Sequence, residues 1–211
     1  MEQQSSITLG LKHYYVIPGG KTYIKTVIAY SSFSDNYNEG YIDSSYVQTD
    51  SYYYDYKYPS FRFSLIGNHK FNSRHSLRIG VNYNHLSGKM ANYRLNSAGL
   101  FDTLVVPEDK ATLLQSHLQW KFRTSGGLEI NTGIHFLHFS LNDESSIEPR
   151  IGLRWQLSPG YAFIAGLGIH SKTESLAAYN SLIKNDEGNR VALNHELKLA
   201  KAFHRIAGVD L

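Results

Sequence analysis

The chain has 211 residues, a formal net charge of +3 and no cysteine, so disulfides and thiolate metal sites are excluded. The small net charge and the absence of a basic run argue against a nucleic-acid partner. A mean hydropathy of -0.34 and the lack of any long apolar run exclude a transmembrane helix, but they are compatible with a transmembrane barrel, whose strands are only half apolar.

Along the chain, about nine segments alternate between apolar and polar residues with the period of two that is typical of β-strands. In the fourth segment, Ile79 and Val81 share one face, whereas Arg78 and Asn82 share the other. The pattern predicts an all-β, antiparallel fold. The predicted strands cover approximately residues 5–16, 21–33, 61–71, 76–85, 112–123, 128–136, 147–157, 161–171 and 200–211.

The connections between these segments alternate between short turns and longer loops. The short turns are rich in Gly, Pro, Asn and Ser, and they fall at residues 17–20, 72–74, 124–127 and 158–160. Outer-membrane barrels combine short periplasmic turns with longer extracellular loops. We therefore expect extracellular loops at residues 34–60, 87–110, 140–145 and 173–197.

The aromatic residues of the apolar face lie near the ends of the predicted strands. Trp120, Trp155 and Tyr161 are close to short turns, and Tyr83 is near the opposite end of its strand. Two aromatic girdles around an aliphatic band are expected for a barrel in lipid. The sequence thus predicts part of an antiparallel transmembrane β-barrel, with its apolar face towards lipid. Alternation alone also permits the reverse, a soluble barrel that binds a ligand and encloses the apolar face.

Charged residues on the polar face are expected to point into the barrel lumen. In a plugged barrel they would hold the plug by ion pairs, and otherwise a water-filled interior would simply tolerate them. The residues concerned are Glu148, Arg150, Arg154, Arg78, Lys121 and Glu129. One exception, Arg205, shares the apolar face of the last strand, so we expect it near the outer rim, against lipopolysaccharide phosphates.

A run of tyrosines falls within the first predicted long loop, and it comprises Tyr52, Tyr53, Tyr54, Tyr56 and Tyr58. Their rings could stack on a glycan or another ligand, or they could belong to an ordinary aromatic-rich loop. The histidines show no metal-ligand spacing, and no nucleophile or dinucleotide motif has the strand–turn–helix context it requires. We expect no catalytic residue, no metal site and no cofactor.

The C-terminal third contains SIEPRIGLRWQLSP, YAFIAGLGIHS and NHELKLAKAFHRIAGVDL. These stretches resemble the barrel of TonB-dependent outer-membrane receptors of Bacteroidetes, in the group with an N-terminal carboxypeptidase-regulatory-like domain. The residues that carry the resemblance are Glu148, Pro149, Arg150, Gly152, Leu153, Trp155, Gly168, His170, Ser171, Lys201, Ala202, His204 and Gly208.

The resemblance implies a barrel of about 22 strands with a plug in its lumen. It also implies uptake of a nutrient whose identity cannot be read, with energy from the TonB complex, in the outer membrane. Residues 1–211 are expected to be a partial barrel domain, without plug, TonB box, signal peptide or the C-terminus of the barrel. The first residues, MEQQSSITLG, show no signal pattern. A plug-less barrel with a structural or adhesive role is the other membrane alternative.

Overall fold

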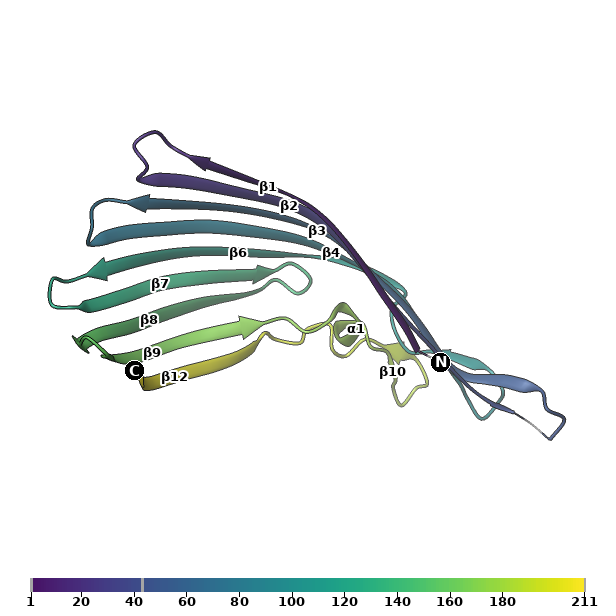
Figure 1. Cartoon of the computed structure of the whole chain (residues 1–211). Helices are drawn as coiled ribbons and strands as arrows, with labels where there is room; N and C mark the ends of the chain where they lie inside the picture. The colour runs from purple at the N-terminus through teal and green to yellow at the C-terminus, as the bar shows by residue number, and fades with distance from the viewer. Residues whose placement is uncertain (1, 43, 211) are drawn as a thin grey trace.

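The computed structural model describes residues 2–42 and 44–210. Within them, ten strands form one antiparallel sheet in the order β1-β2-β3-β4-β6-β7-β8-β9-β12, with β5 paired to β4 (Figure 1). The predicted all-β antiparallel fold is confirmed, and among the described residues β1 and β12 do not pair, so the sheet is an open, curved wall. The strands are β1 (Glu2–Val16), β2 (Thr22–Ile42), β3 (Gln48–Lys70), β4 (His75–Leu95), β5 (Phe101–Thr103), β6 (Glu108–Arg123), β7 (Leu128–Phe139), β8 (Glu144–Ser158), β9 (Tyr161–Lys172) and β12 (Ala200–Asp210).

The short turns lie together at one end of the sheet, on the left in Figure 1. At the first turn, Gly19 and Gly20 have φ values of 98° and 70°, which side chains with a Cβ rarely adopt. At the second, the Asn72 carboxamide oxygen accepts hydrogen bonds from the backbone N–H groups of Arg74 and His75 at 2.8 and 2.9 Å. Residues suited to tight turns therefore define this end.

At the other end, the predicted loops at 34–60 and 87–110 are wrong in extent. β2, β3 and β4 have 21, 23 and 21 residues, so they continue through most of these two ranges. A membrane needs only about 9–11 residues of each strand. Beyond the predicted membrane-spanning part, both faces of a strand meet water or protein. The apolar–polar alternation therefore disappears there, although the strands remain paired.

The remaining two connections also differ from expectation. β7 ends at Phe139 and β8 begins at Glu144, so the predicted loop at 140–145 is a tight turn in which Asp143 has a φ of 58°. The connection at 173–197 is long, as predicted, but it contains helix α1 (Leu176–Tyr179) and the two-stranded ladder of β10 (Ile183–Lys184) and β11 (Arg190–Val191). Leu211, the end of the ninth predicted strand, lies outside the described residues.

A hydrophobic core forms where the α1 connection packs against the long strands. It comprises Met90, Val105, Ala111, Leu137, Phe139, Leu176, Tyr179 and Leu199. The β3–β4 ladder is interrupted at Pro59, which has no N–H to donate. At Gly88 a Cβ would lie 3.3 Å from the Leu176 side chain, so the glycine lets the α1 segment approach the sheet closely.

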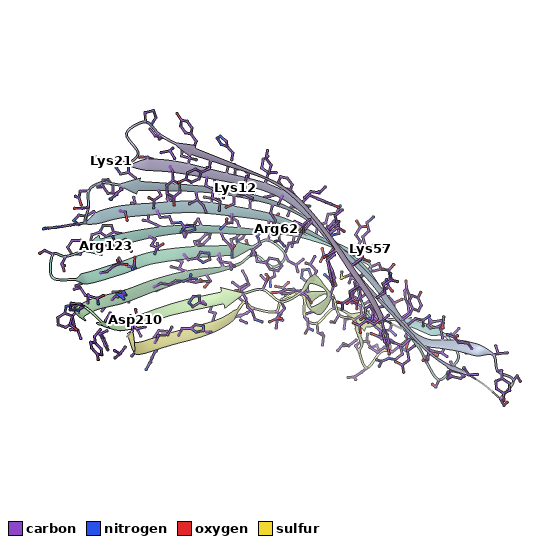
Figure 2. The ribbon with its side chains drawn as sticks, viewed as in Figure 1. Lys12, Lys21, Lys57, Arg62, Arg123 and Asp210 are labelled. Atoms are coloured by element: carbon purple, nitrogen blue, oxygen red, sulfur yellow. The ribbon has the colours of Figure 1, made fainter. Side chains whose placement is uncertain are left out.

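The part of the sheet between this core and the short turns, which the sequence predicts to span a membrane, has no such core. Its apolar side chains share one face and are left exposed; Ile79, Leu118 and Leu167 are 56%, 43% and 49% exposed. Registered pairs such as Ile79 with Leu118, and Leu118 with Ile134, keep these residues on the same face from strand to strand. Figure 2 shows side chains standing on both sides of this single layer. One face therefore suits lipid and the other suits an aqueous or protein-filled lumen.

Candidate functional site

The inner wall of β7, β8 and β9 holds one carboxylate that is almost completely buried. Glu148 is 1% exposed, and one of its oxygens accepts from Arg150 at 2.6 Å and lies 3.0 Å from Nδ1 of His135. Its other oxygen accepts the backbone N–H of Ser171 at 2.9 Å. Both carboxylate oxygens are thus engaged in hydrogen bonds, as a buried carboxylate requires.

The backbone next to Glu148 explains why it is needed there. Pro149 lacks an N–H, and the regular β8–β9 pairing ends at Arg150 opposite Gly168. The Glu148 side chain then takes the N–H of Ser171 in place of a strand partner. The side chain thus joins β8 to β9 beyond the end of their ladder.

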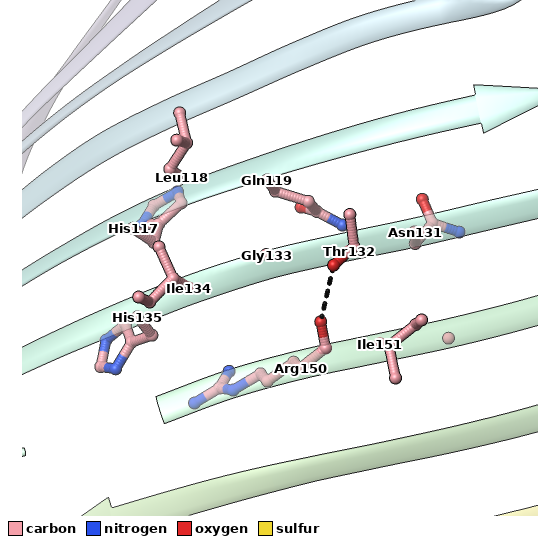
Figure 3. Close-up of a pocket in the computed structure, with 11 residues that line it drawn as sticks. His117, Leu118, Gln119, Asn131, Thr132, Gly133, Ile134, His135, Arg150 and Ile151 are labelled. Carbon is pink, nitrogen blue, oxygen red and sulfur yellow. Dashed lines mark hydrogen bonds between the residues drawn. The ribbon is translucent and has the colours of Figure 1, made fainter. Parts of the chain in front are cut away.

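Beside this network, the sheet is hollowed between β6, β7 and β8 (Figure 3). The hollow has a volume of about 360 Å³. Its polar lining consists of His117, Gln119, Asn131, Thr132, His135 and Arg150. His117 and His135 are directly opposite each other in the β6–β7 register. The lining offers both hydrogen-bond donors and acceptors, and Arg150 adds a fixed positive charge.

A second group of charges lies nearer the short turns. Glu129 forms ion pairs with Lys121 and Arg123, the latter at 2.7 Å, and accepts a hydrogen bond from Asn131 at 3.0 Å. The six predicted lumen residues thus fall into separate sets: Glu148 joins Arg150, and Glu129 joins Lys121.

The other two predicted lumen residues have different surroundings. Arg154 pairs with Asp210 of β12 at 2.7 Å, a partner that the sequence did not indicate. Arg78 forms no ion pair with any residue of the described ranges. His135 was also missed as a partner of Glu148; the two face each other across β7 and β8, which only the register reveals.

The tyrosine run lies in strand β3, so its predicted placement in a loop is wrong. Tyr52, Tyr54, Tyr56 and Tyr58 follow one another on the inner face, with successive ring centroids 6.1, 4.9 and 5.9 Å apart. Tyr53 points to the other face.

The inner tyrosines form a ladder with neighbouring groups. Tyr37 of β2 stacks on Tyr54 at 5.7 Å, and the guanidinium of Arg94 lies 5.3 Å from the Tyr52 ring centroid. Tyr58 lies at the edge of the hydrophobic core, and burial raises its pKa to about 12. Tyr54 is stacked between Tyr37 and Tyr56, so it offers its edge and hydroxyl group rather than its faces to a ligand, whereas Tyr52 meets Tyr54 edge to face.

Ion pairs connect the loops at the end of the sheet opposite the short turns. Asp102 of β5 binds Arg190 of β11 at 2.9 Å and Lys184 of β10 at 3.4 Å. The hydrogen bond from Arg190 is the main reason that the pKa of Asp102 lies below its ordinary value. The β10–β11 ladder is thereby fastened to the β4–β6 connection.

The four residues predicted for the aromatic girdles all lie on the apolar face. Trp120 stacks on Phe122 with ring centroids 5.6 Å apart, close to a short turn. Trp155 and Tyr161 flank the β8–β9 turn, and Tyr83 sits opposite Phe63 and Leu114 further along its strand. Their place in two aromatic girdles stays a prediction.

Arg205 lies on the apolar face, but not where the sequence placed it. It is opposite Leu167 at the middle of β12, rather than at the outer rim. Its guanidinium lies 4.8 Å from the Phe203 ring centroid, and this cation–π contact gives the charge a partner on an apolar surface.

Two findings concern the described residues as a whole. No helix in ranges 2–42 and 44–210 is long and apolar enough to cross a membrane. In the same ranges, no cluster of three or more His, Asp or Glu side chains could hold a metal ion.

Comparison with known proteins gives one family and several solved structures. The model of the family described as TonB dependent receptor-like, beta-barrel matches residues 2–189. No curated protein sequence matches the chain. The chain superposes on the siderophore receptor PirA of Acinetobacter baumannii with a TM-score of 0.76 and 14% identity, covering 99% of this chain and 32% of that one.

Two further structures show the same fold. A mutant of the ferric enterobactin receptor PfeA of Pseudomonas aeruginosa gives a TM-score of 0.75 at 11% identity, with 99% of this chain and 32% of that chain covered. The outer membrane transporter YddB of Escherichia coli gives 0.69 at 10% identity, with 98% and 32% covered. The chain therefore spans about a third of the length of these proteins.

Proposed function

Because this chain belongs to the TonB-dependent receptor-like β-barrel family, we propose that it forms part of the wall of a receptor that imports a nutrient. The family and the similar structures place the chain in the outer membrane. That location removes the soluble-barrel alternative. The observation that carries the proposal is the two-sided sheet, with exposed aliphatic residues on one face and a hydrogen-bonded charged network on the other.

Residues 1–211 supply one part of a larger barrel in this proposal. The free hydrogen-bonding edges of β1 and β12 support it, since a strand edge within a membrane needs a partner. The residues shared with the Bacteroidetes group, among them Glu148, Pro149 and Arg150, favour that type of receptor with its regulatory domain. The role is transport rather than catalysis.

A plug domain inside the barrel is the partner that the inner wall fits. Arg150 would make the contact with the plug through its free N–H donors, because its side chain is 42% exposed. Glu148 stays buried and would hold Arg150 in position. Arg154, Lys121 and Glu129 would line the same lumen nearer the periplasm. A plug held by such polar contacts can be released when the TonB complex pulls, because each hydrogen bond is worth only about 0.5–1.5 kcal/mol.

The nutrient would first meet the extracellular ends of β2, β3 and β4. The edges and hydroxyl groups of Tyr52, Tyr54 and Tyr56 line the inner face there, and Arg94 adds a positive charge. Tyr53 would not take part from the inside, since it stacks on Tyr93 on the outer face at 4.9 Å. The solved receptors named above for siderophores make ferric siderophores the first compounds to test.

Conductance of the intact receptor in a planar lipid bilayer tests this proposal. A barrel closed by a plug passes no current until urea unfolds the plug, and we expect that behaviour. A receptor that conducts without urea would contradict the proposal and would favour the plug-less structural barrel. Uptake of radioactive iron as ferric enterobactin, with and without the receptor gene, then examines the nutrient.

A further inference from the structure

In the membrane-spanning part of the sheet, the inner face of β1–β4 carries cations without counter-charges. Lys12, Lys25, Arg62, Lys70 and Arg78 share this face, and we name them the basic wall. Figure 2 labels Lys12 and Arg62 among them. None forms an ion pair with a residue in ranges 2–42 and 44–210. The sequence allows none nearby, because residues 3–34 and 56–101 contain neither Asp nor Glu.

The cross-strand neighbours of the basic wall are also neutral. Lys25 is opposite Tyr14 and Ile66 in the β1–β2 and β2–β3 registers. Arg78 is opposite Asn68 and Gln119. The sheet therefore supplies hydrogen-bond acceptors at most, and the positive charge faces the lumen uncompensated.

The other half of the wall is different. On the inner face of β7, β8 and β12, each carboxylate of the membrane-spanning part is matched to a cation: Glu129 to Lys121, Glu148 to Arg150, and Asp210 to Arg154. With Arg123, which also pairs with Glu129, this half of the wall has four cations against three carboxylates and is almost neutral. The β1–β4 half, in contrast, produces a positive potential that would attract a negative partner.

The width of the basic wall indicates what kind of partner would neutralise it. Its cations come from four adjacent strands, and three inter-strand steps of about 4.8 Å span roughly 14 Å. An opposite charge acts strongly only within about 4–6 Å, so a single small anion cannot reach all five groups. A surface that carries several carboxylates can.

We propose that the basic wall is the docking surface for an acidic face of the plug domain, which it binds by charge complementarity. This rests on the proposed function, because it requires a plug in the lumen. It assigns the electrostatic attachment of the plug to β1–β4, while the paired charges of β6–β12 contribute hydrogen bonds.

The test measures the urea concentration at which the intact receptor begins to conduct in a planar bilayer. We expect the double change Arg62→Glu and Arg78→Glu to lower this midpoint by roughly 1 M, since like charges would then face each other. Arg62→Gln with Arg78→Gln should lower it by less. Raising the salt concentration should lower the wild-type midpoint and affect the Glu variant little.

Lys57→Glu is the matched control. It makes the charge change of one of the two substitutions on the opposite face of β3, where Lys57 pairs with Asp55 at 3.7 Å, and it should leave the midpoint unchanged. A difference in electrophoretic migration between the unheated and the heated protein verifies that each variant has folded.

The outcomes separate this inference from the proposed function. A wild-type receptor that conducts without urea has no plug, so the proposed function fails. A silent wild type with the same midpoint in both double variants overturns the inference alone. Unchanged midpoints combined with lost binding of ferric enterobactin, an anionic solute, would assign these cations to the solute instead and would also overturn it.

Discussion

The membrane-spanning part of the sheet and the part beyond it are stabilised by different means. In the first, a single layer of strands leaves Ile79 and Leu118 exposed on one face and seats charged groups on the other. In the second, the long strands and the α1 connection enclose a hydrophobic core around Leu137 and Phe139. The difference shows that lipid replaces a core only over the height of the membrane; above it, the protein must bury its own apolar residues.

The largest effect is expected in the core beyond the membrane. Leu137 is 1% exposed, so Leu137→Ala should cost about 2–5 kcal/mol of local stability by leaving a cavity. Hydrogen exchange of the Asn180 amide, which donates to the Leu176 carbonyl, measures the opening of the α1 segment.

Leu100→Ala is the control for this change, because Leu100 is 66% exposed in the same part of the protein. It should alter the exchange by no more than about 0.5 kcal/mol. Equal effects of the two substitutions would show that the core does not hold the segment in place.

The next effect concerns the lipid face. Leu118→Arg should destabilise the barrel by about 2–4 kcal/mol, because a guanidinium near the bilayer midplane loses its hydration. Gln119→Arg, one residue further on β6, points inward and should cost less than about 1 kcal/mol. Denaturant titration of the receptor in lipid vesicles gives both values. A larger loss for Gln119→Arg would mean that the faces are reversed.

A smaller effect is expected at the buried carboxylate. Glu148→Ala removes the acceptor of Arg150, His135 and the Ser171 N–H, and should cost about 1–3 kcal/mol. Amide exchange at Ser171 should rise with it. Glu196→Ala changes a carboxylate that is 81% exposed and should leave exchange at Ser171 unaltered. Protection that persists in Glu148→Ala would show that the side chain does not join β8 to β9.

The smallest effect is the pH dependence of the β10–β11 ladder. The folded pKa of Asp102 lies below its ordinary value of 3.8, chiefly through Arg190. The stabilisation is therefore present above pH 3.8 and is lost as the pH falls through the lower, folded pKa. Amide exchange of Lys184 and Arg190 against pH measures it. Asp102→Asn should abolish the dependence, and an Asp102 that titrates above 3.8 would contradict it.

The sequence could predict the membrane-spanning region, where one face of the sheet contacts lipid and the other faces the lumen. Where lipid meets one face and the lumen the other, side chains must alternate, so strands such as 76–85 and 112–123 were recognisable, as were the turns built on Gly19 and Asn72. Beyond the membrane this constraint ends. The sequence therefore predicts a loop for Tyr52 to Tyr58, although these residues pair as part of strand β3. Aromatic residues occur on both faces there, so no alternation marks the strand.

The sequence could predict which face of the sheet carries the residues of the candidate site, but not which residues pair with one another. The polar face of Glu148 and Arg150 follows from alternation along one strand. The pairing of Glu148 with His135, and of Arg154 with Asp210, depends on the register between strands. That register is set by turns such as the one containing Asp143, whose length the sequence overestimated.

Spin labelling of strand β8 in the intact receptor tests the central claim, that apolar side chains face lipid and polar ones face the lumen. This chain has no cysteine, so labels can be attached singly at Ile151→Cys, Gly152→Cys, Leu153→Cys, Arg154→Cys and Trp155→Cys. Collision with oxygen, which dissolves in lipid, should peak at positions 151, 153 and 155 and fall at 152 and 154. Peaks at 152 and 154, or no alternation, would contradict the account.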